Sequence, residues 1–200
     1  MYNSDWDVLA IAGPSGVGKS SLSYPLARKF GVPLVEADDL FQAVEALTTP
    51  AQQPWIHYWR THPQSALLPA AEVLDLHLKV CRAMTPALKA VINNHMETNT
   101  PIVLDGDYIL PELVAEFRER VKAVFLYEET VDQLVHNFSI REPNNGTQRS
   151  RAEVSALFGR WQQSECQRLG LIALPARPWD TLAQRAAAAI EAQKMNHRST

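Results

Sequence analysis

A glycine-rich segment near the N-terminus has the residue types that bind phosphate. Residues 13–20 read GPSGVGKS, after a short apolar run at residues 8–12 and before a stretch with helical spacing of its apolar residues. Glycines let backbone N–H groups turn inward around a phosphate, because no Cβ blocks the approach. The first turn of the following helix adds unpaired N–H groups and the positive end of its dipole. We therefore expect this loop to bind the phosphates of a nucleotide.

Two side chains at the end of this segment add specific chemistry. Lys19 offers a positive charge to the β- and γ-phosphates, and the Ser20 hydroxyl is placed to ligate Mg²⁺. The spacing thus predicts a site for ATP with Mg²⁺. The residues expected to contact the nucleotide here are Gly13, Ser15, Gly16, Val17, Gly18, Lys19, Ser20 and Ser21.

An acidic segment follows the second apolar run of the chain. Residues 36–39 read EADD and come directly after residues 32–35. In open parallel sheets, ligands bind at the carboxyl ends of the strands. Asp38 is therefore a candidate general base that accepts a proton from a substrate hydroxyl. Helix capping is the alternative for Asp38, and capping or a secondary contact is favoured for Asp39.

A third apolar run, residues 101–104, ends in Asp105. An aspartate at the end of an apolar strand, in a chain with a phosphate loop, is predicted to hold Mg²⁺ through a water molecule. Gly106 follows at the position where many ATP-hydrolysing motors carry a glutamate. This glycine argues against a hydrolytic motor.

Two further segments have unusual compositions. Residues 48–69 contain four prolines and many aromatic residues. We expect an insertion that binds the acceptor, with Arg60 available to an anionic or hydroxylated substrate; the alternative is a small hydrophobic cluster that packs a loop onto the body.

Residues 140–152 are polar and carry three arginines. We expect a lid in which Arg141 and Arg149, with Arg151 as a third candidate, neutralise charge during phosphoryl transfer. A solvated connector is the alternative.

The order of the elements predicts the fold class. Five apolar runs alternate with helical stretches, which is typical of an α/β protein with a parallel sheet covered by helices on both faces. The apolar stripe of residues 70–99 predicts a long helix, kinked or divided at Thr85-Pro86. We expect residues 1–200 to form a single domain that includes the insertion and the lid.

The composition excludes several classes of protein. Hydrophobic residues make up 46% and charged residues 20% of the 200 residues, and the net charge is −3, so no basic surface for nucleic acid is expected. No apolar run is long enough to span a membrane. The first residues lack the pattern of an export signal. The expected partner is thus a small-molecule acceptor in the cytoplasm, with no nucleic acid or membrane, and the oligomeric state stays open.

Together these motifs resemble the P-loop kinases of nucleotides and other small molecules over most of the chain. The loop GPSGVGKS is also similar to that of guanylate kinases, but their segment that binds guanine monophosphate is missing here. The acidic end of the second strand resembles the shikimate, gluconate and chloramphenicol phosphotransferase groups. In those groups an aspartate at the place of Asp38 contacts the acceptor hydroxyl. The stretches SGVGKSSLSYPLARKFGVPLVEADDL and IVLDGDYILPEL are most similar to 2-phosphoglycerate kinase-like proteins. The chain departs from that family's arginine-rich pattern after the second strand.

The resemblance implies a P-loop NTPase fold with an arginine-bearing lid and an ATP- and Mg²⁺-dependent kinase that phosphorylates a small-molecule hydroxyl. It also implies that the loop at residues 175–179, with Arg177, lies near the adenine. Two alternatives are an ATP-binding regulatory protein with little or no transfer and a toxin-type nucleotide-sugar kinase. The sequence leaves the choice between ATP and GTP open.

Overall fold

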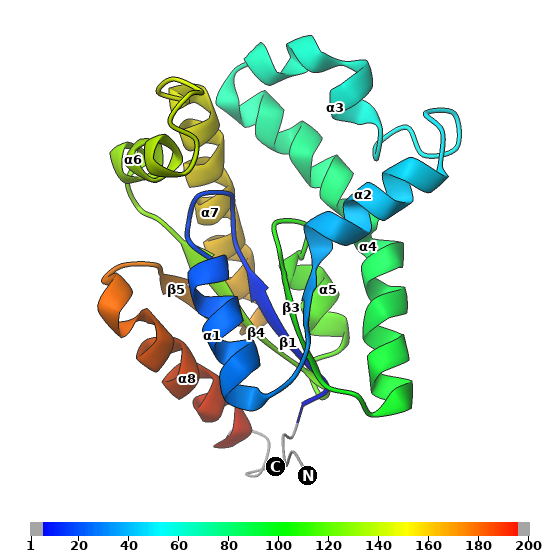
Figure 1. Ribbon diagram of the computed structural model, residues 1–200, viewed down its shortest axis with the longest axis vertical. Coiled ribbons are helices and arrows are strands. Elements are labelled where there is room, and N and C mark those ends of the chain that lie inside the picture. The colour runs from blue at the N-terminus through cyan, green and yellow to red at the C-terminus, as the bar shows by residue number, and fades with distance from the viewer. Residues whose placement is uncertain (1–5, 196–200) are drawn as a thin grey trace.

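One parallel sheet forms the centre of the computed structural model, which describes residues 6–195 (Figure 1). Its five strands lie in the order β2-β3-β1-β4-β5, and every neighbouring pair is parallel. The strands are β1 Val8–Ala12, β2 Leu34–Glu36, β3 Ile102–Gly106, β4 Val121–Tyr127 and β5 Ala173–Pro175. The predicted five-stranded parallel sheet is confirmed. The expectation that the first residues form no export signal concerns residues 1–5, which lie outside the described part.

Helices cover both faces of the sheet, as the sequence predicted. In Figure 1, α1 and α8 lie on one side and α4 and α5 on the other, while α7 packs against α4, α5 and β4. The helices are α1 Ser20–Phe30, α2 Ala37–Leu47, α3 Tyr58–Thr61, η1 Pro63–Leu67, α4 Ala70–Thr98, α5 Pro111–Glu116, α6 Val131–Arg141, α7 Arg149–Leu169 and α8 Trp179–Met195. No helix among residues 6–195 is long and apolar enough to cross a membrane.

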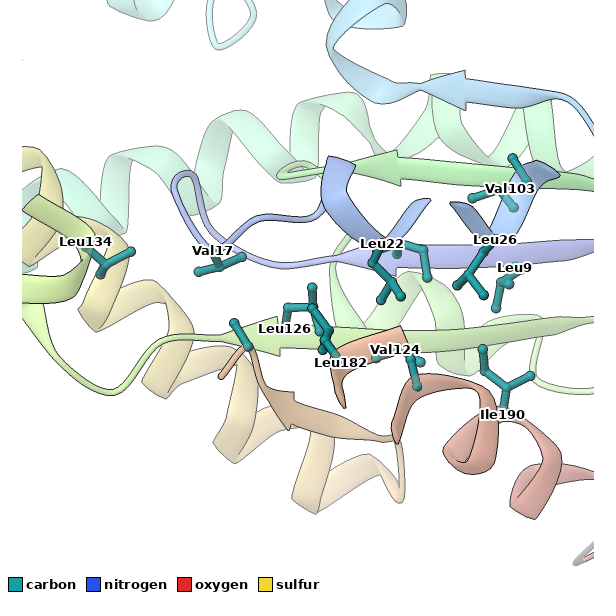
Figure 2. Packing of buried hydrophobic residues seen from close by; sticks show 14 of the residues in the cluster. Leu9, Val17, Leu22, Leu26, Val103, Val124, Leu126, Leu134, Leu182 and Ile190 are labelled. Atoms are coloured by element: carbon teal, nitrogen blue, oxygen red, sulfur yellow. The ribbon is translucent and has the colours of Figure 1, made fainter. Parts of the chain in front are cut away.

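The central strand β1 explains why both faces are buried. Leu9 and Ile11 point to the side of α1 and α8, where Leu22 and Leu26 of α1 pack with residues of α8 (Figure 2). The intervening alanines of β1 point to the opposite side and pack with α4 and α5. Because side chains alternate along a strand, an uninterrupted apolar run fits a strand that is covered on both faces.

The long helix α4 continues through Pro86. The division that the sequence offered as one possibility, besides a kink, does not occur. The helix runs from Ala70 to Thr98, with Pro86 inside it. Proline removes one backbone hydrogen bond. The buried stripe on either side of the proline, with Met84 and Leu88 fully buried, packs against the sheet and holds the helix together. Tertiary packing thus overrides the local preference.

Strand register brings the functional segments to one edge. Ala12 of β1 pairs with Gly106 of β3, and Glu36 of β2 pairs with Asp105 of β3. The three strands therefore end side by side, so the loops that follow them lie together. A Cβ on Gly106 would overlap the Cβ of Ala37, the first residue of α2. The close approach of β3 and α2 leaves no room for a side chain at the position that a glutamate occupies in motors.

Candidate active site

The loop between β1 and α1 has the backbone conformation that a phosphate site requires. Gly16 and Gly18 have φ angles of +85° and +82°, in the region that favours glycine. The helix α1 begins at Ser20, directly after the loop. Its first N–H groups and its dipole therefore lie where a phosphate would bind.

A cavity of about 680 Å³ opens at the carboxyl end of the sheet. It is lined by residues from the phosphate loop, from the ends of β2 and β3, and from α3, η1, α4, α6 and α7. Of the residues expected at the site, those that line this cavity are Ser15, Lys19, Ser20, Asp38, Asp105, Arg141 and the third lid candidate, Arg151.

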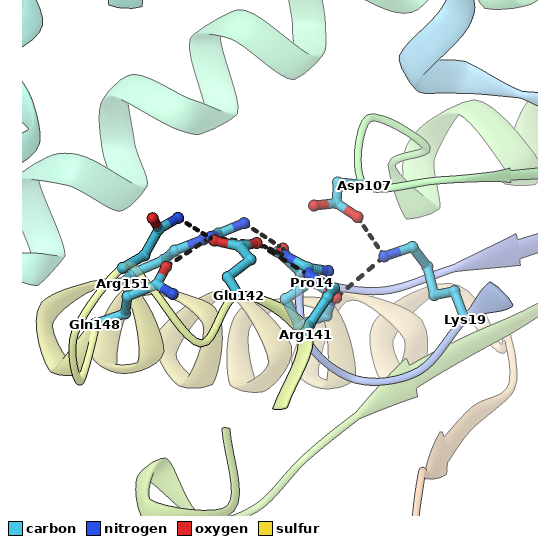
Figure 3. Close-up of polar contacts among 9 residues, drawn as sticks. Pro14, Lys19, Asp107, Arg141, Glu142, Gln148 and Arg151 are labelled. Atoms are coloured by element: carbon cyan, nitrogen blue, oxygen red, sulfur yellow. Dashed lines mark hydrogen bonds and ion pairs between the residues drawn. The ribbon is translucent and has the colours of Figure 1, made fainter. Parts of the chain in front are cut away.

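Lys19 lies deep in this cavity and has two partners. Its Nζ donates a hydrogen bond to the carbonyl oxygen of Pro14 at 3.1 Å and forms an ion pair with the carboxylate of Asp107 (Figure 3). The Lys19 side chain is 11% exposed. Asp107 was not expected at the site, although it follows Asp105 by only two residues. An acidic residue just beyond a strand that ends in aspartate was the signal available in the sequence.

One carboxylate oxygen of Asp105 accepts a hydrogen bond, and the other has no partner among the described residues. The Ser23 hydroxyl donates to its Oδ2 at 2.7 Å, whereas its buried Oδ1 has no hydrogen-bond partner among the described residues. Burial raises the pKa of Asp105 to about 6, against the opposing effects of Lys19 and of the Ser23 hydrogen bond. A buried, unpartnered carboxylate oxygen that lines the same cavity as Ser20 fits Mg²⁺ bound through water.

The donor set also suits this ion. The described residues contain no group of three or more His, Cys, Asp or Glu side chains that could hold a metal ion by themselves. Mg²⁺ in nucleotide sites typically uses one or two protein ligands, with phosphate oxygens and water completing the shell. Ser20 and Asp105 meet that requirement.

Asp38 opens to the same cavity from the first turn of α2. The helix begins at Ala37, earlier than expected, so Asp38 and Asp39 lie inside its first turn rather than at a capping position. Burial by the cavity walls raises the pKa of Asp38, and the charge of Asp107 adds to this effect. A carboxylate with a raised pKa is better suited to accept a proton. Asp39 does not line the cavity.

Two lid arginines contact the phosphate loop directly. The Nη2 atoms of Arg141 and Arg151 donate to the Ser15 hydroxyl at 3.3 and 3.1 Å. Both arginines also pair with Glu142 (Figure 3), whose pKa is lowered to about 2, chiefly by its hydrogen bond from Arg141. Their guanidinium groups lie over the ring of Phe138, at 5.4 Å for Arg141 and 4.3 Å for Arg151. The arginines are thus held beside the phosphate loop.

Arg149, the other arginine chosen from the sequence, lies elsewhere. It donates to Asp132 at 3.0 Å, pairs with Glu153 at 3.5 Å and does not line the cavity. Arg151, the third candidate, lines the cavity in its place. The helix α7 begins at Arg149 and sets the direction of both side chains.

A second hollow of about 310 Å³ lies on the other side of the phosphate loop. Gly16, Gly18 and Ser21 line it, together with Trp179 at the start of α8. A Cβ on Gly18 would overlap the Trp179 ring, so the ring lies directly on the loop. Trp179 was not chosen from the sequence.

The loop before α8 presents Trp179 rather than Arg177 to this hollow. Arg177 forms two hydrogen bonds to Glu128, at 2.8 and 2.7 Å, and lines neither this hollow nor the first cavity. Two other expected residues of the phosphate loop line neither space: Val17 is fully buried in the core, and Gly13 lies against the backbone of Leu126.

The aromatic segment at residues 48–69 contributes only Trp59 and Ala66 to the cavity. Arg60 is held away from it, because its Nη2 donates to Nδ1 of His57 at 2.6 Å and its Nε lies 3.5 Å from Glu45. An arginine can only donate, so Nδ1 of the fully buried His57 accepts, and Nε2 donates to Thr48 at 3.1 Å. Part of this segment therefore packs on α2, and its role in binding the acceptor stays a prediction.

No protein-family model matches this sequence, and no curated protein does. Solved structures, by contrast, resemble it over nearly its full length. A gluconokinase from Sinorhizobium meliloti 1021 is 17% identical, with 98% of each chain covered and a TM-score of 0.54. A shikimate kinase from Acinetobacter baumannii, solved with shikimate, is 15% identical over 94% of this chain and 95% of that chain, with a TM-score of 0.53.

A deoxyadenosine kinase from M. mycoides is 11% identical over 92% of this chain and 99% of that chain, with a TM-score of 0.51. At these identities the likeness establishes the fold, which is that of the P-loop small-molecule and nucleotide kinases. The fold implied by the sequence motifs is thus confirmed. The particular similarity to 2-phosphoglycerate kinase-like proteins stays a prediction.

Proposed function

We propose that this protein is an ATP- and Mg²⁺-dependent kinase that transfers the γ-phosphoryl group to a hydroxyl of a small molecule. The observation that carries the proposal is a single cavity in which Lys19, the free oxygen of Asp105 and the carboxylate of Asp38 lie together. Two arginines bonded to Ser15 of the phosphate loop complete it. The shared fold of the kinases named above supports the same class of reaction.

Each residue has a role in the proposed reaction. The loop amides and Lys19 hold the phosphates, and Ser20 and Asp105 hold Mg²⁺, which offsets phosphate charge when bound. Asp38 accepts the proton of the acceptor hydroxyl as the new O–P bond forms. Arg141 and Arg151 stabilise the charge that develops on the transferring group. The sequence leaves the choice between ATP and GTP open, and a cytoplasmic location remains an expectation from it.

The proposal is tested by ADP release from Mg·ATP across a panel of hydroxyl compounds that includes sugars, glycerate-type acids, aminocyclitols and phenicols. We expect release that depends on one acceptor class and disappears in Lys19→Ala, because the lysine holds the transferring phosphates. ATP binding without release stimulated by any compound would contradict the kinase and favour a nucleotide-gated regulatory protein. Transfer to nucleotide-sugars alone would favour the toxin-type kinase.

A further inference from the structure

The lysine and arginine side chains of the main cavity all form hydrogen bonds to residues of the phosphate loop. Among the described residues that line it, the lysine and arginine side chains are Lys19, Arg141 and Arg151. Lys19 is bonded to Pro14, and both arginines are bonded to Ser15. Bound triphosphate would use the same three cations. None is then left for a negatively charged group on an acceptor.

The opposite end of the cavity is apolar and aromatic. Trp59 of α3, Val73 of α4 and Phe158 of α7 line it, from three separate elements. Apolar and aromatic walls favour a ligand with a flat, weakly polar portion, because burial of its apolar surface is favourable and stacking on the aromatic rings adds to this. These three lining residues therefore carry no charge.

The polar groups at that end are neutral hydrogen-bonding groups. Burial lowers the pKa of His77, so its imidazole stays uncharged near neutral pH. Burial also raises the pKa of Tyr108, so its phenol keeps its proton. Both side chains line the cavity, and the ring of His77 lies edge-on to Phe158 with centroids 5.0 Å apart. They can orient a hydroxyl or amide but cannot neutralise an anion.

Carboxylates line the same cavity. They belong to Glu36, Asp38 and Asp107. When Lys19 turns to bound phosphates, the ion pair that now neutralises Asp107 opens and leaves its carboxylate facing the acceptor. Arg60 is unable to compensate, because His57 and Glu45 hold it outside the cavity. An anionic acceptor would thus be desolvated beside carboxylates with no cation to pair with, which is costly.

We propose that the acceptor is a hydroxyl compound without a carboxylate or phosphate group, neutral or carrying an amine, with a flat apolar portion that lies among Trp59, Val73 and Phe158. The proposal rests on the proposed kinase function and narrows its substrate class. It favours aromatic alcohols and amino alcohols over sugar acids and glycerate-type acceptors.

A matched set of probes tests this assignment on the protein loaded with Mg·ADP. Phenylethanediol, phenylethanolamine and mandelic acid share one benzylic hydroxyl and differ in a neutral, cationic or anionic neighbour. Ligand-observed NMR titration gives the affinity of each. We expect the diol and the amine to bind at least about tenfold more tightly than the acid. Equal or tighter binding of the acid would overturn the proposal, and so would failure of all three to bind.

Two variants connect the preference to the apolar end. Val73→Arg places a cation there and should raise the relative affinity for mandelic acid about tenfold or more. Leu67→Arg adds the same charge at a side chain that is 87% exposed in η1 and should leave the order of affinities unchanged. Circular dichroism and retained Mg·ADP binding confirm that both variants fold. An unchanged preference in folded Val73→Arg would contradict the location.

Turnover separates this proposal from the kinase assignment. Lys19-dependent transfer to an acid and to no neutral compound would overturn the acceptor class while leaving the kinase intact. Absence of Lys19-dependent transfer to any compound would speak against the kinase. The binding preference is decided in either case, because it is measured without turnover.

Discussion

Asp107 occupies the lysine that the phosphates of a nucleotide would bind. The lysine Nζ is bonded to Pro14 and paired with the Asp107 carboxylate, which is 22% exposed. The phosphates of bound ATP would replace the Asp107 carboxylate as the negatively charged partner of the lysine. Binding of ATP then changes two things together: it engages the lysine and frees a carboxylate on the acceptor side.

Asp38 is the residue on which the proposed proton transfer depends. We expect Asp38→Asn to bind ATP normally but to lower the transfer rate about a hundredfold or more, because the amide cannot accept the proton. ATP affinity and acceptor-dependent ADP release measure the two effects separately. Asp39→Asn is the matched control, since Asp39 is the next residue of α2 and does not line the cavity. Full transfer by Asp38→Asn would show that another group is the base.

The raised pKa of Asp105 predicts a pH-dependent stability. The folded protein holds the proton of Asp105 up to about pH 6, against an ordinary pKa of 3.8, so the folded state loses stability as the pH rises from about 3.8 to about 6, and the loss is complete above that range. Asp105→Asn cannot ionise and still accepts the Ser23 hydrogen bond. We therefore expect it to stabilise the metal-free protein at pH 8 by about 3 kcal/mol, since the pKa rises from 3.8 to about 6 and one pKa unit corresponds to about 1.4 kcal/mol.

The same substitution should have a smaller effect, about 1 kcal/mol, at pH 4.5, because Asp105 of the unmodified protein is still protonated in the folded state there while the unfolded chain is only partly beyond its ordinary pKa. Thermal unfolding without metal or nucleotide, at both pH values, makes the comparison. A gain in stability that is equal at the two pH values would contradict the raised pKa. Ser23→Ala is an independent check: it removes a hydrogen bond that favours the ionised form, so it should raise the pKa further.

At the scale of elements, helix geometry decides which lid arginine reaches the site. The lid was expected as a loop through residue 152, but α7 begins at Arg149. Residues two apart on a helix point about 200° away from each other around the axis, so Arg149 and Arg151 cannot face the same cavity. Arg151 turns to Ser15 and to the ring of Phe138 in α6, whereas Arg149 turns to Asp132 at the surface.

Substitution of the two arginines tests this geometry. Arg151→Ala should lower the rate of phosphoryl transfer about a hundredfold, which is typical for the loss of one group that stabilises transition-state charge. Arg149→Ala should retain a rate close to that of the unmodified protein. Steady-state kinetics with a saturating acceptor provides the comparison. The reverse ranking would show that α7 starts later when nucleotide binds.

At the scale of the whole molecule, helices packed on both faces of the sheet hold the site together. Leu26 of α1 is 2% exposed and lies between the sheet and α8 (Figure 2). We expect Leu26→Ala to lower the free energy of unfolding by about 2–5 kcal/mol, because it removes buried methyl groups and leaves a cavity.

The control for this substitution is Leu67→Ala. Leu67 is 87% exposed, so its truncation should change the free energy of unfolding by less than about 0.5 kcal/mol. Urea denaturation measures both variants. Similar losses in the two would mean that the layer between α1 and α8 does not stabilise the domain as its burial indicates.

The sequence by itself determined the fold and the phosphate end of the site. Alternating apolar runs and helices predicted the parallel sheet, because buried strands and amphipathic helices have different periods. The segment GPSGVGKS is local: its glycines, lysine and serine are adjacent in the chain, so their spacing alone predicted where they lie. The aspartates at the ends of β2 and β3 followed from the rule that parallel strands end at one edge.

Only the tertiary structure decided how distant side chains meet. The pairing of Lys19 with Asp107 and of both lid arginines with Ser15 joins segments that are far apart in sequence. Because α7 begins at Arg149, Arg151 lies toward the cavity and Arg149 lies away from it. The hydrogen bond to His57 holds Arg60 outside the cavity. Those outcomes depend on packing directions and on competition among partners, which no local pattern contains. The character of the acceptor end follows from that arrangement.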